Sequence, residues 1–176
     1  MTQAALLVLL LCTLPAQAAS VQVYFSPALV PQTTADCARV QAVRRELSAT
    51  PALATAALRL LFAGPSEEER AAGLRSHFSP ATAGLLKRLV IRRGTAYVDL
   101  HDLRSALSGA SSSCGALELR AQIERTLRQF PSVQRVRLAI DGDPRALHDW
   151  LGEPCDATNG HCDPRPFRTA PAAAPR

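Results

Sequence analysis

The most regular pattern in the chain runs over residues 111–140, SSSCGALELRAQIERTLRQFPSVQRVRLAI. Its three opening serines are good N-cap residues, and the proline at position 131 cannot continue a helix. Between them, apolar residues recur at helical spacing, at Ala116, Leu119, Ile123, Leu127 and Phe130. The charged residues fall on the other side, at Glu118, Arg120, Glu124, Arg125 and Arg128. This pattern predicts an amphipathic helix whose apolar stripe packs on a core and whose charged side faces solvent.

A strand is expected directly after this helix. Apolar Val136, Leu138 and Ile140 alternate with Arg135 and Arg137 over this stretch. Side chains alternate between the two faces of a strand, so packing the apolar residues into a core turns both arginines to the opposite face.

A second arginine-bearing strand is predicted upstream, where Leu89 and Ile91 alternate with Arg88 and Arg92. Residues 93–100 then supply a tight turn and a returning strand, which together make a hairpin. The four outward arginines of the two strands could therefore share one face of a sheet.

Two strands and a helix are predicted before this hairpin. Alternating apolar residues indicate strands at 21–25 and 38–47. Thr50 is a good N-cap, and Pro51 suits the first position of a helix that ends at Gly64.

Two short helices complete the predicted elements. Ser66 and Glu69 form a capping box for the first, and Asp143 caps the second, which Gly152 ends. The whole order of elements predicts an α+β fold, in which helices cover one face of a small mixed β-sheet.

The first 18 residues are expected to be a cleaved signal peptide. An apolar run over 6–11 is too short to span a bilayer, and Ala16 and Ala18 form a small-x-small cleavage site. We therefore expect a mature chain that begins near Ala19, is secreted or periplasmic and does not span a membrane. A buried core helix and lipidation at Cys12 are the alternative interpretations.

Export leaves four cysteines in a compartment where disulfides persist: Cys37, Cys114, Cys155 and Cys162. Spacing alone does not choose among their three pairings. We expect Cys155 to pair locally with Cys162 around a polar Asn-Gly loop, and Cys37 to pair with Cys114. Six residues separate the local pair, whereas zinc-binding cysteines are usually two to four apart, so no metal is expected. Residues 153–168 then form a disulfide-stapled extension, and 169–176 a disordered tail.

The formal net charge of +5 comes almost entirely from arginine. The four outward arginines form a candidate anion-binding face: Arg88, Arg92, Arg135 and Arg137. A solvated, arginine-rich surface without a ligand is the alternative. A nucleic-acid partner is not expected, because export separates the protein from cellular nucleic acid and aromatic residues make up only 5% of the chain.

The chain resembles the GerMN domain of the sporulation and spore germination family, in one copy over residues 19–152. The stretches that carry the resemblance are VQVYF (21–25), LLFAGP (60–65), GLRS (73–76), GTAYVDL (94–100), TLRQFP (126–131) and IDG (140–142). The segments around residues 111–115 and 150–162 are similar to a cysteine-bearing subgroup.

This resemblance implies a fold similar to ring-building modules of secretion and sporulation assemblies, an envelope location and no established catalytic residues or cofactor. We therefore expect a non-catalytic interaction module in cell-envelope assembly, whose partner is an envelope protein or an anionic envelope polymer. An envelope hydrolase with an unrecognised site and a passive structural domain are the rival interpretations.

Overall fold

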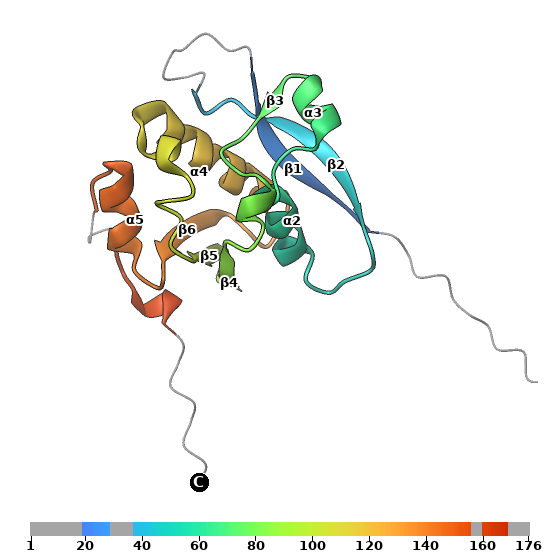
Figure 1. Cartoon of the computed structure of the whole chain (residues 1–176). Coiled ribbons are helices and arrows are strands. Elements are labelled where there is room, and N and C mark those ends of the chain that lie inside the picture. The colour runs from blue at the N-terminus through green and yellow to red at the C-terminus, as the bar shows by residue number, and fades with distance from the viewer. Residues whose placement is uncertain (1–18, 29–36, 156–159, 169–176) are drawn as a thin grey trace, which may run out of the picture.

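A computed structural model describes residues 19–28, 37–155 and 160–168 (Figure 1). The expected signal peptide at 1–18 and the expected tail at 169–176 lie outside these residues. Within them, no helix is both long enough and apolar enough to cross a bilayer.

The described strands form two three-stranded sheets. The first sheet has the order β2-β1-β3 and is antiparallel, with β1 at Ala19–Pro27, β2 at Gln41–Leu47 and β3 at Leu74–Arg75. The second has the order β4-β5-β6, with β4 at Leu86–Arg92, β5 at Thr95–Leu100 and β6 at Arg135–Ile140. Strands β4 and β5 are antiparallel, and β5 and β6 are parallel. The α+β class and the mixed sheet are confirmed.

The helices are α2 at Leu53–Phe62, α3 at Glu67–Ala71, α4 at Ser113–Arg128 and α5 at Pro144–Leu151. Short 3-10 turns lie at Pro80–Thr82 (η1), Ser108–Ser111 (η2) and Arg165–Phe167 (η3). Helices α2 and α4 contact each other and β1, and they also reach β4 and β6 respectively. They therefore lie between the two sheets, while α5 packs against β6 (Figure 1).

Side chains of α4 and of its C-cap residue, Gln129, cover the part of β1 that β3 leaves unpaired. The Gln129 amide accepts from the Gln22 backbone N–H at 2.8 Å and donates to the Gln22 carbonyl at 2.6 Å. The backbone N–H of Tyr24 donates to Thr126 Oγ1 at 3.2 Å. These bonds satisfy backbone groups that a further strand would otherwise pair. A single continuous sheet, as the sequence suggests, is thus replaced by two sheets with a helix between them.

The polar side of α4 is more buried than its sequence pattern predicts. Glu118 was expected in solvent, yet it is 3% exposed, and Gln122 and Thr126 are fully buried. The Gln122 amide donates to Ser26 Oγ at 2.9 Å and to Glu118 Oε1 at 3.2 Å. The helix has two packed sides, because its apolar stripe meets the core and its polar side meets the edge of β1. Glu118, Gln122 and Thr126, spaced four residues apart, line this second side.

Most helix ends follow the predicted capping. Ser66 and Glu69 form their capping box, and Asp143 Oδ1 accepts from the Arg145 N–H at 2.8 Å. Thr50 is the exception, because α2 begins at Leu53. The Thr50 hydroxyl accepts from the Ala52 N–H at 3.2 Å, so it closes a turn before the helix.

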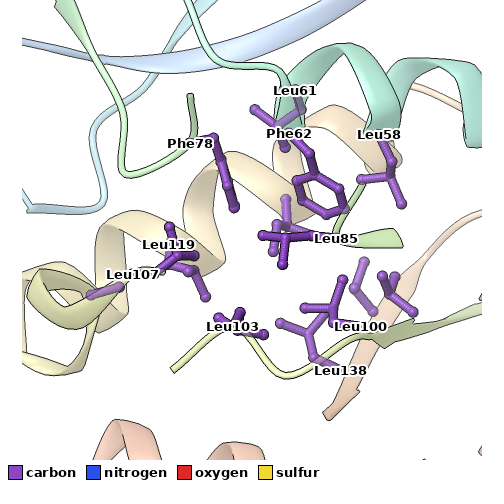
Figure 2. Close-up of a cluster of buried hydrophobic side chains, with 14 of the residues drawn as sticks. Leu58, Leu61, Phe62, Phe78, Leu85, Leu100, Leu103, Leu107, Leu119 and Leu138 are labelled. Atoms are coloured by element: carbon purple, nitrogen blue, oxygen red, sulfur yellow. The ribbon is translucent and has the colours of Figure 1, made fainter. Parts of the chain in front are cut away.

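The core is formed by the inner face of β4-β5-β6, by the apolar sides of α2 and α4 and by Val23 and Phe25 of β1 (Figure 2). The predicted α4 stripe is confirmed, since Leu119, Ile123 and Leu127 have no exposed surface. In Figure 2, side chains from α2 such as Leu58 and Phe62 lie toward Leu100 and Leu138 of the second sheet.

We expect Gly64→Ala to be much more destabilising than Gly73→Ala. Both glycines have positive φ, at 77° and 86°, so an alanine is strained at either position. A Cβ at position 64 would lie 2.4 Å from the Phe78 carbonyl oxygen, whereas one at position 73 would meet nothing within 4 Å. Gly73→Ala should cost about 1 kcal/mol of unfolding free energy and Gly64→Ala about 2–4 kcal/mol. Urea denaturation of both variants measures the difference, and equal losses would contradict the close approach.

Candidate anion-binding site

The outer face of β4-β5-β6 carries all four arginines that the sequence singles out. Pairing joins Arg92 to Thr95 and Thr95 to Arg135, which makes one row across the three strands. The next row contains Arg137 opposite Tyr97 of β5. Alternation therefore sends these side chains away from the core, as the apolar pattern of each strand requires.

Arg92 and Arg135 both lie at one end of this face. They line a depression of about 610 Å³ with six further residues: Arg93, Thr95, Tyr97, Asp163, Arg165 and Pro166. We call it the arginine depression. Arg135 Nε donates to Thr95 Oγ1 at 3.3 Å. Thr95 is buried, so its hydroxyl forms a polar floor between two strand-borne guanidinium groups.

Arg88 lies at the other end of the same face. It pairs with Asp99 of β5 in the register, and its guanidinium donates to the Phe167 carbonyl oxygen. A second depression there is lined by Arg88 and Lys87 together with the carboxylates of Asp99 and Asp141. The charge at this end is mixed.

Arg137 occupies an intermediate position on this face. It is half-buried, and this burial, followed by the charge of Arg135, lowers its pKa. The structure thus places Arg92 and Arg135 in one row, on either side of β5, and places Arg137 and Arg88 in successive rows farther along the sheet.

A segment that we call the C-terminal strap, residues 160–168, crosses this outer face. Phe167 is 4% exposed and its ring meets Tyr97 edge-on at a centroid distance of 5.6 Å. Figure 1 shows the strap and η3 beside the second sheet. Tyr97 and Phe167 together separate the arginine depression from the mixed-charge end. No pattern in this proline- and arginine-rich segment predicts that it packs on the sheet.

The strap brings two charged residues that sequence analysis missed to the arginine depression. Arg165 lies at its rim, and its guanidinium makes a bidentate pair with Asp163, with Nε–Oδ1 at 2.9 Å and Nη2–Oδ2 at 2.8 Å. Hydrogen bonds from Arg165 lower the pKa of Asp163, so this carboxylate stays ionised at neutral pH. Arg93 was also missed as a site residue, because the sequence assigns it only to a turn.

Both expected cysteine pairs lie at disulfide distance. Cys37 and Cys114 have Cα atoms 5.1 Å apart, and Cys155 and Cys162 have Cα atoms 5.7 Å apart. The first pair ties the N-terminus of α4 to the chain just before β2. The second pair ties the start of the strap to the chain that follows α5.

Two other clusters of titratable groups lie away from the outer face. His148 is buried beside Glu153, which Arg120 binds through both carboxylate oxygens. Burial, and then the charge of Arg120, lower the pKa of His148. Glu118 is paired with Arg75 at 3.4 Å. Among the residues that the structure describes, no group of three or more potential ligands could hold a metal ion.

Comparison with known proteins adds the family. A model of the Germane family, described as sporulation and spore germination, matches residues 22–146. The chain belongs to the Germane (GerMN) family. No curated protein and no solved structure matches it. The Germane match ends within α5, so it covers Arg92 and Arg135 but not Asp163 or Arg165 of the strap.

Proposed function

We propose that this Germane protein is a non-catalytic, extracytoplasmic interaction module that binds an anionic partner of the cell envelope through its arginine depression. The extracytoplasmic location rests on the expected signal peptide at 1–18 and on two cysteine pairs at disulfide distance. Disulfide bonds persist in oxidising compartments. Family membership supports a role connected with sporulation or germination.

The observation that carries this proposal is the row of Arg92, Thr95 and Arg135 on the outer face. Exposed arginines scattered over a surface bind little, whereas guanidinium groups held on neighbouring strands can grip one anion together. Four arginines line the depression, against one carboxylate, that of Asp163. The excess of positive charge favours an anionic polymer or an acidic protein.

Retention on isolated envelope tests the proposal. The mature protein is compared with the variant R92Q/R135Q across a salt series. A control variant, R39Q/R59Q, removes the same charge from exposed arginines outside the depression. We expect retention to weaken with salt, because exposed charges are screened over about 8 Å at physiological ionic strength. We expect R92Q/R135Q to lose about tenfold in affinity and the control to lose much less.

Two results would overturn the proposal. Retention that is insensitive to salt and equal in all three proteins would remove the arginine depression from binding. Recovery of a cytoplasmic chain that still begins with Met1, instead of an exported chain that begins near Ala19, would remove the envelope location. N-terminal sequencing of the fractionated protein gives the second answer.

An envelope hydrolase is the rival function. It would need a nucleophile, a base and an orienting group converging in one cleft. The described residues that line the arginine depression include no histidine or cysteine, and the carboxylate among them, Asp163, is bound by Arg165. Its lining therefore favours binding over hydrolysis.

A further inference from the structure

We propose that the arginine depression binds a phosphate group, and that the C-terminal strap both completes this site with Arg165 and restrains it with Asp163. This inference rests on the proposed function, because it names the chemistry of the anion that the outer face would bind. The phosphate would belong to an envelope molecule, either a lipid headgroup or a polymer.

The register of the second sheet places the binding groups around one point. Arg92 and Arg135 are both cross-strand neighbours of Thr95. Neighbouring strands lie about 4.8 Å apart, so the two arginine Cα atoms are about 10 Å apart with Thr95 between them. The bond from Arg135 Nε to Thr95 Oγ1 draws one guanidinium toward β5. The long side chains of Arg92 and Arg135, on either side of the small Thr95, can therefore bind one anion above Thr95.

The charge of the depression is largely uncompensated. Within the described part of the chain, no ion pair joins Arg92, Arg93 or Arg135 to a carboxylate. Arg165 is the rim arginine that is neutralised, by Asp163. Like charges held at one end of a sheet repel one another, and a bound anion relieves that repulsion.

The number of donors favours phosphate over a carboxylate. A carboxylate is satisfied by one bidentate arginine, as Asp163 is by Arg165. Three more guanidinium groups remain, from Arg92, Arg93 and Arg135, each with five N–H donors. A phosphate monoester offers three strong acceptor oxygens and up to two negative charges, so it can engage several of these groups at once.

The strap gives the depression an internal competitor. Phe167 is buried against Tyr97, and Arg88 bonds its carbonyl oxygen, so the strap is held on the sheet. This anchoring keeps Asp163 in the lining, where its carboxylate occupies Arg165. A phosphate that engages Arg165 must compete with this carboxylate. Removing the Asp163 charge should therefore strengthen binding without adding any contact.

A matched control exists for that variant. Asp102 and Arg104 have the same spacing as Asp163 and Arg165 and form the same bidentate pair, with Arg104 Nε–Oδ1 at 2.9 Å and Nη2–Oδ2 at 2.7 Å. Asp102 follows the C-terminal end of β5, whereas the arginine depression lies at its N-terminal end. D102N and D163N thus remove the same charge and the same kind of ion pair at opposite ends of one strand.

The test is a titration of the mature protein with inorganic phosphate at low salt, measured by calorimetry. A parallel titration with acetate probes carboxylate binding. We expect phosphate to bind more tightly than acetate, and R92Q/R135Q to weaken phosphate binding about tenfold or more. D163N should tighten it about twofold to fivefold, and D102N should leave it unchanged. Equal effects of D163N and D102N, or acetate bound as well as phosphate, would overturn the inference.

A second arm uses vesicles of phosphatidylcholine, a zwitterionic phosphodiester, with and without phosphatidic acid, whose headgroup is a phosphate monoester. Binding that requires phosphatidic acid and Arg92 with Arg135 assigns the phosphate to a lipid headgroup. Binding of inorganic phosphate without vesicle binding assigns it to a polymer, and either result supports the site. The proposed function can survive a failure here. Phosphate binding that is unchanged in R92Q/R135Q overturns this inference, whereas the function is overturned by arginine-independent retention on envelope or by a cytoplasmic chain that still begins with Met1.

Discussion

Leu127→Ala is expected to lower the free energy of unfolding by about 2–5 kcal/mol. Leu127 has no exposed surface and lies in the cluster that joins α2, α4 and the second sheet. Truncating Leu127 removes apolar contacts and leaves a cavity. Elements pack on both sides of the helix, so this cavity cannot easily close. Phosphate binding and envelope retention should not change at temperatures where the variant is folded.

Arg128→Ala is the control for this measurement. Arg128 is exposed on the same last turn of α4 and makes a surface ion pair with Glu124. Such pairs contribute about 0.3–0.5 kcal/mol, so chemical denaturation should show a much smaller loss than for Leu127→Ala. A loss below about 0.5 kcal/mol for Leu127→Ala would mean that α4 does not pack as the structure shows.

Removing the long-range disulfide is expected to cost about 4.5 kcal/mol in the chain-entropy description. Cys37 and Cys114 are 77 residues apart, so their bond restricts a large loop in the unfolded chain. The comparison variant is C155S/C162S, which removes the bond between two cysteines 7 residues apart in sequence. It should lower the free energy of unfolding by about 2.5 kcal/mol. The double variant C37S/C114S should therefore unfold at a clearly lower denaturant concentration than C155S/C162S.

Peptide mapping without reduction accompanies this comparison. We expect one cross-linked peptide that contains Cys37 and Cys114, and one that contains Cys155 and Cys162. A peptide that joins Cys37 to Cys155, or equal stability of C37S/C114S and the unmodified protein, would contradict the pairing.

Local periodicity is enough to predict most elements of this fold. Apolar alternation marks β4, β5 and β6, and the 3.6-residue spacing marks the core stripe of α4. The capping residues Ser66 and Asp143 do what their sequence context predicts. These features depend on a few neighbouring residues, so they are visible before any long-range contact is known.

Features set by distant contacts could not be predicted in this way. Glu118 and Gln122 look like solvent-facing residues, and the approach of distant segments that carry Ser26, Arg75 and Ser76 buries them. Alternation predicts that Arg92 and Arg135 face away from the core, but not that β5 lies between them. The contribution of Arg165 depends on Phe167 docking against Tyr97, for which the strap has no periodic signal.

The most direct test of the arginine depression follows the arginine Nε–Hε signals of the mature protein by NMR while inorganic phosphate is added. The signals of Arg92 and Arg135 are expected to shift progressively and saturate, and added salt should reverse the shift. The exposed Arg39 and Arg59 serve as internal controls and should hardly move. Equal shifts in all four signals, or none at Arg92 and Arg135, would contradict the account.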